Sequence, residues 1–188
     1  MPEEKNSSFL GDTLRFALIT LAIVIPIRFF IAEPFIVSGA SMEPTFHNGE
    51  YLIVDRLSYH VREPERGEVI VFRFPEDPSK HFIKRIIGLP EEKVRLVGKS
   101  VFITNEEHPQ GEEIKEEYIR ENGYNDLSIT LGEDEYFVMG DNRNHSSDSR
   151  LWGALPQHFI VGRAYLRLFP IKTASYLPGD DSGRRQDR

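Results

Sequence analysis

One long apolar stretch lies near the N-terminus, and the apolar residues after it form only short runs. Between Phe16 and Ala32 only Thr20 and Arg28 are polar, and Pro26 is the one helix breaker. At about 1.5 Å of rise per residue, a helix of this length covers about 25 Å of a hydrocarbon core about 30 Å thick. The pattern predicts a single membrane-spanning helix, with the Arg28 side chain reaching the interface or the bilayer thinning around it.

Two other interpretations of this stretch fit the residues less well. A cleaved signal peptide needs a basic start and a small-x-small cleavage site, but neither is found before Glu33. A buried core helix would present one apolar face, and no such stripe separates two faces between Phe16 and Ile27. The basic residues around the stretch do not fix its orientation. We therefore predict residues 1–32 to be an N-terminal tail and transmembrane anchor.

After residue 37 the apolar runs are short, rich in β-branched and aromatic side chains, and separated by Gly, Pro, Asn and Asp. Such runs are typical of strands joined by turns, and no helical pattern longer than two turns interrupts them. We predict an all-β body over residues 33–177, built as a coiled, mostly antiparallel sheet in the form of a barrel or sandwich. The predicted strands are 51–54, 68–74, 81–87, 93–97, 100–104, 127–131, 136–139 and 161–169.

Composition and charge narrow the function classes. The 30 acidic and 23 basic residues give a net charge of -7, which argues against a protein that binds nucleic acid through its phosphates. The absence of Cys excludes disulfides, thiol nucleophiles and Cys-ligated metals. Residues 105–126 carry eight acidic and two basic side chains, which predicts a solvated excursion or, alternatively, a surface for a basic partner. Residues 178–188 lack apolar anchors and are predicted to be disordered.

Several familiar sites are excluded by spacing. Gly98-Lys99-Ser100 ends like a phosphate-binding loop, but Lys93 stands where the first Gly is needed. The six His residues never occur at the spacing of paired metal ligands, so we predict no catalytic metal and no cofactor. The segment from Gly39 to Glu43 lacks the closing Gly of a nucleophile elbow and runs into Pro44, which excludes an α/β-hydrolase.

A serine in a loop of small residues is the first candidate for chemistry. Ser41 lies within Ser38-Gly39-Ala40-Ser41-Met42, where backbone N–H groups could approach a reacting carbonyl oxygen as an oxyanion hole. A plain turn explains the same composition, because Gly, Ser and Pro gather in loops for conformational reasons. The residues alone leave both interpretations open.

A lysine in an apolar strand is the second candidate. Strand alternation puts Lys84 on the same face as Phe82 and Ile86. With an ordinary pKa near 10.4, only about one Lys in 2,500 is neutral at pH 7. Burial disfavours the ammonium form and can lower the pKa to roughly 7 to 8, where the amine can accept a proton from a Ser hydroxyl. The alternative is a surface Lys whose stem lies along the strand.

A dense polar loop follows the apolar run 136–139. In residues 140–153 a Ser hydroxyl could orient the neutral amine, and an ion pair of Asp148 with Arg150 could keep the loop rigid. A hydrogen-bonded turn would have a similar composition. A dyad of His145 with Ser146 is disfavoured because adjacent side chains usually point apart.

Taken together, these segments resemble the type I signal peptidases, which are membrane-bound Ser-Lys proteases that remove signal peptides from exported proteins. The matching segments occur in the family's order between residues 33 and 163. They are Glu33-Pro34-Phe35, Ser41-Met42-Glu43-Pro44-Thr45, Gly49-Glu50-Tyr51-Leu52-Ile53-Val54, Arg66-Gly67-Glu68-Val69-Ile70-Val71-Phe72, Phe82-Ile83-Lys84-Arg85-Ile86-Ile87-Gly88-Leu89-Pro90, Gly140-Asp141-Asn142-Arg143, Ser149-Arg150 and Gly153.

The resemblance implies roles for individual residues on an all-β catalytic fold. Ser41 would be the nucleophile and Lys84 the general base. The Ser146 hydroxyl would orient the amine, with Asp148 and Arg150 as a structural pair behind it.

The resemblance also implies how the substrate is held. The Ser41 N–H would form the oxyanion hole, and Gly39 stands where some members add a Ser hydroxyl, so that Ser38 could replace it. Asn144 stands where other members have an acidic residue.

The implied partners are signal peptides and the lipid bilayer, and the implied location is the bacterial cell membrane, with one span and the catalytic body outside the cytoplasm. The implied pocket residues are Phe35, Val37, Met42, Phe82 and Ile83.

Two other functions fit some of these residues. A self-cleaving Ser-Lys protease of the SOS-repressor type shares the chemistry and a related fold, but there a DNA-binding helical domain takes the place of the apolar segment. A catalytically inactive, membrane-tethered binding module could retain the sheet without the reaction.

Overall fold

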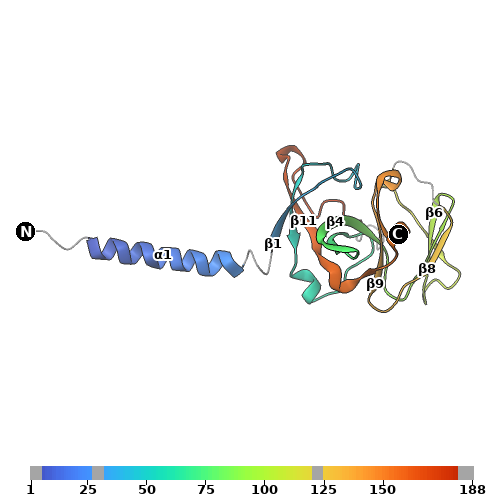
Figure 1. The fold of residues 1–188 in the computed structure, drawn as a ribbon, viewed down its shortest axis with the longest axis horizontal. Helices are drawn as coiled ribbons and strands as arrows, with labels where there is room; N and C mark the ends of the chain where they lie inside the picture. Colours follow the sequence, from blue (N-terminus) through green and yellow to red (C-terminus); the bar gives the residue numbers. More distant parts are fainter. Residues whose placement is uncertain (1–5, 27–31, 120–124, 182–188) are drawn as a thin grey trace, which may run out of the picture.

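The computed structural model describes residues 6–26, 32–119 and 125–181. The first segment forms one helix, α1 (Asn6–Pro26), and Figure 1 shows it apart from the β-rich body. No helix in the described segments is both long enough and apolar enough to cross a membrane. The predicted anchor continues past Pro26 into residues 27–31, which lie outside the described residues. The large exposed apolar side chains of α1 include Leu14, Phe16, Leu18, Ile19, Leu21 and Val24.

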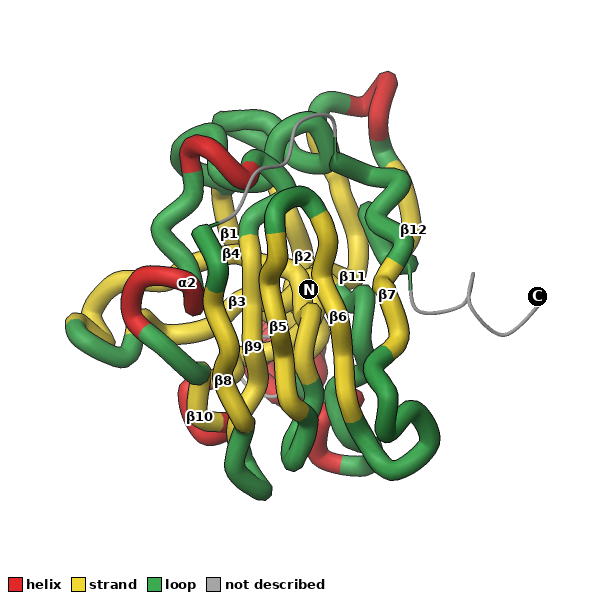
Figure 2. Tube along the Cα trace, turned by 90° about the vertical axis from the view of Figure 1, so that its right-hand side faces the viewer, coloured by secondary structure: helices red, strands yellow, loops and turns green. Residues whose placement is uncertain are grey.

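The body consists of two antiparallel sheets (Figure 1). The larger sheet has the order β1 (Ala32–Ile36), β2 (Tyr51–Asp55), β11 (Ile160–Phe169), β3 (Val69–Phe74), β4 (Asp77–Gly88), β9 (Glu135–Met139) and β10 (Leu155–Pro156), and β12 (Ser175–Tyr176) pairs with β11. The smaller sheet has the order β7 (Glu112–Ile114), β6 (Ser100–Thr104), β5 (Lys93–Val97) and β8 (Leu127–Thr130). Figure 2 looks onto this smaller sheet, with strands of the larger one behind it.

The prediction of an all-β body is confirmed. Every predicted strand has a counterpart within about two residues at most ends, and β4 extends further towards its N-terminus than the predicted strand. The one α-helix of the described body, α2 (Ser149–Trp152), has four residues. The strands missing from the prediction are short or lie in segments whose composition indicated another structure. They are β1, β7, β10 and β12. β1 begins at the last residue of the predicted anchor, Ala32, and no strand was predicted before residue 51.

Three buried clusters make up the core. One lies between the smaller sheet and β9, and includes Val94, Phe137 and Met139. The other two lie on either side of β4: Ile83 packs against the cluster that contains Met42, and Ile86 belongs to the cluster that contains Phe72. Because β4 runs between two apolar clusters, a polar side chain at its centre is removed from water.

Two segments differ from the sequence prediction. The acidic excursion of residues 105–126 is only partly solvated, because β7 pairs with β6 and buries Ile114. Residues 178–181, predicted to belong to a disordered tail, pack on the body: Pro178 is buried and the Gly179 carbonyl accepts a hydrogen bond from Arg85. A backbone hydrogen bond to a buried arginine supplies the anchor that apolar side chains do not. Residues 120–124 and 182–188 lie outside the described residues.

Candidate active site

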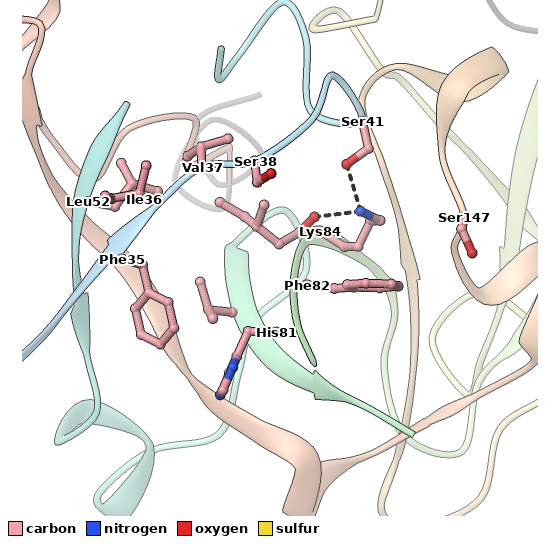
Figure 3. A pocket seen from close by; sticks show the side chains of 12 residues that line it. Phe35, Ile36, Val37, Ser38, Ser41, Leu52, His81, Phe82, Lys84 and Ser147 are labelled. Carbon is pink, nitrogen blue, oxygen red and sulfur yellow. Dashed lines mark hydrogen bonds between the residues drawn. The ribbon is translucent and has the colours of Figure 1, made fainter. Parts of the chain in front are cut away.

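The two side chains singled out from the sequence meet at the edge of a cavity. Lys84 lies in β4, where it is paired with Ile70 of β3, and its Nζ donates a hydrogen bond of 2.7 Å to Ser41 Oγ. The Nζ donates a second hydrogen bond, of 2.8 Å, to the Ile83 carbonyl (Figure 3). Two residues 43 positions apart in the chain are thus within hydrogen-bond distance, as a nucleophile and its base must be.

Burial determines the charge state of the Lys84 amine. Only 3% of the residue is exposed, and the Phe82 ring centroid lies 5.3 Å from the Nζ. Desolvation lowers the pKa of Lys84 to about 8, although the negative charges of Asp148 and Asp141 act in the opposite direction. At pH 7 about one molecule in ten then carries a neutral amine, a fraction several hundred times larger than for an exposed lysine.

The loop before Met42 holds the backbone around Ser41 in a defined orientation. Asn142 donates from its side chain to the Ala40 carbonyl and from its backbone to the Ser41 carbonyl, both at 3.0 Å. Since C=O and N–H point in opposite directions across a trans peptide, the Ser41 N–H faces away from Asn142. No protein group in the described segments accepts a hydrogen bond from this N–H. It is free to face a developing oxyanion.

Gly39 adopts a backbone conformation that favours glycine. Its φ is +91°, and its N–H donates a hydrogen bond of 3.0 Å to Asn48 Oδ1. The Gly39 N–H is therefore already occupied, and it is not a second donor for an oxyanion in this conformation. Ser38 is exposed and lines the cavity next to the dyad, as Figure 3 shows.

The polar loop after β9 forms the wall behind the dyad. Asp148 accepts two hydrogen bonds from the Arg150 guanidinium, at 2.7 and 2.8 Å, and a third from the Gly140 N–H at 3.0 Å. The Asp148 side chain is fully buried. A buried carboxylate with three charge-assisted or backbone partners keeps the loop in one conformation.

The Ser146 hydroxyl is buried and has no hydrogen-bond partner within the described part of the chain. It packs against Gly140, where an added Cβ would lie 2.3 Å from Ser146 Oγ and 2.4 Å from the Ser41 carbonyl oxygen. Only glycine fits at position 140, because this is the point where the polar loop and the Ser41 loop touch. The Ile83 carbonyl, and not the Ser146 hydroxyl, accepts the second hydrogen bond of the Lys84 amine.

The cavity next to the dyad has a volume of about 220 Å³ and is mainly apolar. Of the predicted pocket residues, Phe35, Val37, Phe82 and Ile83 line it. Met42 is not among the lining residues: it is 1% exposed and packs in the core with Phe46. The lining residues that the sequence did not single out are Ile36, Leu52, Val71, His81 and Ser147. Leu52 could have been found, because it alternates with Tyr51 and Ile53 as an inward-facing strand residue.

Two further polar residues of the loop, Asn144 and His145, do not line the cavity. Asn144 and His145 are exposed, and a ring nitrogen of His145 lies 3.2 Å from Asn142 Oδ1. No group of three or more possible metal ligands is found among the residues that the structure describes.

Comparison with known proteins gives consistent matches. The chain matches the family described as "Signal peptidase, peptidase S26" over residues 10–169. It is 38% identical over 170 residues to the probable signal peptidase I-1 of Synechocystis sp., covering 86% of this chain and 84% of that protein. It is 35% identical over 181 residues to the signal peptidase I P of Bacillus subtilis subsp. natto, covering 90% of this chain and 94% of that protein.

Among solved structures, the crystal structure of a signal peptidase I from Enterococcus faecalis V583 aligns with 29% sequence identity and a TM-score of 0.46. The alignment covers 55% of this chain and 97% of that chain.

Removing the buried amine is expected to change how stability depends on pH. The folded pKa of about 8 lies below the ordinary 10.5, so between these pH values the unfolded chain holds a proton that the folded chain has released. The destabilisation by the charged amine is therefore complete below pH 8 and disappears as the pH rises to 10.5. Chemical unfolding should show that, from pH 7 to pH 10, the free energy of unfolding of the wild type rises by about 2 to 3 kcal/mol more than that of Lys84→Met. An equal difference at both pH values would contradict a desolvated amine.

Proposed function

The chain belongs to the S26 family of signal peptidases, and from that premise we propose how its own residues remove signal peptides from exported preproteins. The observation that carries the proposal is the 2.7 Å contact between the buried Lys84 amine and the Ser41 hydroxyl. A lysine with a pKa of about 8 is a competent base at neutral pH, and a serine needs such a base to become a nucleophile.

In the proposed reaction Lys84 enters as the neutral amine and accepts the hydroxyl proton of Ser41 as Oγ attacks the carbonyl carbon of the scissile peptide. The carbonyl oxygen takes up the negative charge and receives a hydrogen bond from the Ser41 N–H. The tetrahedral intermediate collapses, and the Lys84 ammonium gives its proton to the leaving amine. An acyl-enzyme remains, and Lys84 takes a proton from a water molecule that attacks the ester carbonyl. The Lys84 ammonium returns this proton to Ser41 Oγ as the ester bond breaks, which releases the signal peptide with a free carboxyl group and restores the dyad.

The proposed substrate pockets are the apolar walls of the cavity. Phe35 of β1 and Ile83 of β4 come from two strands that both reach the cavity, so an extended peptide can pair with their backbones and turn alternate side chains inward. The lining of the cavity is mainly apolar, and the family to which the chain belongs is that of the signal peptidases. This supports cleavage after small residues.

The proposed supporting residues act on the conformation of the dyad. The Asp148–Arg150 pair holds the polar loop against Gly140, and Gly140 contacts the Ser41 backbone. The Ser146 hydroxyl, which is buried and has no hydrogen-bond partner among the described residues, is available to orient the amine once a substrate occupies the site. Ser38 at the rim is the side-chain hydroxyl closest in sequence to the nucleophile and could supplement the oxyanion hole.

Two alternative functions are not favoured. Self-cleavage of the SOS-repressor type and binding without catalysis do not fit the relatives, which bear the name signal peptidase I. A binding module would also have no use for a lysine whose burial destabilises its charged form next to a serine.

We further propose that the apolar segment 16–32 anchors the protein in the bacterial cell membrane with the body on the extracytoplasmic side. The support is the composition of the segment and the exposed apolar side chains of α1, which do not contribute to the core of the body. Exposed apolar surface of this extent is typical of contact with lipid or protein. An anchor would hold the catalytic cavity near the membrane from which signal peptides emerge.

Variants of the dyad test the proposed reaction. Purified protein incubated with a preprotein should generate one new N-terminus, located by mass spectrometry directly after a small residue. Ser41→Ala and Lys84→Arg should each lower the cleavage rate by at least about a thousandfold while the protein remains folded, because a guanidinium is not deprotonated in this pH range. Leu151→Ala, at an exposed position of α2, is the matched control and should cleave normally. Full activity of Lys84→Arg would overturn the assignment of the base.

Sedimentation with liposomes tests the proposed anchor. The full chain should sediment with the vesicles, and the double variant Phe16→Asp/Leu21→Asp should remain largely in the supernatant, because each buried carboxylate opposes insertion. Val61→Asp, which changes an equally exposed apolar side chain of the body, should sediment like the wild type. Equal sedimentation of the double variant and the wild type would contradict the anchor.

A further inference from the structure

Among the described residues of the acidic excursion, one carboxylate does not face solvent. Lys115 and Glu117 are exposed, whereas the Glu116 side chain between them is 4% exposed. Its two oxygens accept hydrogen bonds from both terminal nitrogens of Arg143, at 2.7 and 2.5 Å, and the Arg143 side chain is fully buried. A bidentate, buried pair of this kind is geometrically specific, and removing one partner leaves an uncompensated charge.

Arg143 belongs to the polar loop that forms the wall of the active site. Its Nε donates a hydrogen bond of 2.9 Å to the Gly140 carbonyl, and its own carbonyl accepts a hydrogen bond of 2.7 Å from Arg150 Nη2. Arg150 in turn holds Asp148, which accepts from the Gly140 N–H. Arg143 therefore connects the beginning of the loop to the ion pair at its end, and Glu116 fixes Arg143.

A second residue of the excursion, Tyr118, is connected to the same loop through Arg85. The Tyr118 hydroxyl donates a hydrogen bond of 2.8 Å to Glu116 Oε1, and the centroid of the Tyr118 ring lies 3.9 Å from the Arg85 guanidinium. Arg85 binds Asp141 through two hydrogen bonds, at 2.8 and 2.6 Å, and both side chains are fully buried. Burial raises the pKa of Tyr118 well above its ordinary value, so the phenol remains a donor.

We propose that Glu116 is a positioning residue of the Ser41–Lys84 dyad: through Arg143, and with Tyr118 on Arg85, it holds the loop 140–148 closed over the lysine amine. This inference rests on the proposed function and assigns a role to the excursion. The loop supplies Gly140 against Ser41 and the two carboxylates that act on Lys84, namely Asp141 and Asp148. If the loop relaxes, water reaches the amine, its charged form is stabilised, and the base is protonated over a wider pH range.

The test compares full-length Glu116→Gln, which keeps the shape of the side chain but removes its charge, with Glu117→Gln, its exposed neighbour. The pH profile of kcat/KM is measured with a peptide that spans a signal-peptide cleavage site, together with the melting temperature. The wild type should lose activity as the pH falls below about 8, which gives the profile an acidic limb. In Glu116→Gln this limb should move upward by about one pH unit, so that kcat at pH 7 falls about tenfold while KM changes less than twofold. Glu117→Gln should match the wild type.

Tyr118→Phe removes the hydrogen bond to Glu116 but keeps the ring on Arg85, and it should move the limb in the same direction by a smaller amount. It provides the test if Glu116→Gln does not fold. A lower melting temperature with an unchanged limb and kcat, in whichever of the two variants folds, would make Glu116 structural only and overturn the proposal. This outcome is distinct from failure of the proposed function, in which the wild type itself does not cleave or Ser41→Ala still does.

Discussion

The structure depends on removing one amine from water. Lys84 occupies the centre of a strand that passes between two apolar clusters, and within the described part of the chain its Nζ has only the Ser41 hydroxyl and one backbone carbonyl as hydrogen-bond partners. The charged form is disfavoured there by desolvation, and the same desolvation that lowers stability leaves part of the amine neutral, and so able to accept a proton, at neutral pH. The all-β body provides such a position because alternate residues of a central strand can be covered on both faces.

Keeping the amine dry requires the walls around it to be rigid, and buried ion pairs make them so. Asp148 with Arg150, Asp141 with Arg85 and Glu116 with Arg143 all converge on the loop after β9. Each pair alone is weak evidence for stability, since desolvation of the charges offsets their attraction. Together they restrict the loop to one geometry, which is what a contact of 2.7 Å between a base and a nucleophile demands.

Much of this arrangement could be predicted from the sequence, for identifiable reasons. Short β-branched and aromatic runs separated by turn residues located the strands. Period-two alternation put Lys84 on an apolar face, because successive side chains of a strand point to opposite sides of the sheet. The meeting of Ser41 with Lys84 was different: it depends on a tertiary approach across 43 residues, and only the ordered resemblance to a family indicated it. Met42 packs in the core and does not line the cavity, because a residue next to a nucleophile in sequence can point into the core. Glu116 was missed although Ile114, Glu116 and Tyr118 share one face by period two, because the surrounding charges dominated the interpretation.

The most direct test of a dry, titratable amine is to observe it. Protein labelled with ¹³C at the lysine Cε positions would be titrated by NMR, with Lys84→Arg identifying the Lys84 signal by its loss. The account predicts an inflection near pH 8 for this signal, while the exposed lysines titrate near their ordinary value of about 10.4. A Lys84 signal that titrates together with the exposed lysines would show a hydrated ammonium beside Ser41 and contradict the account.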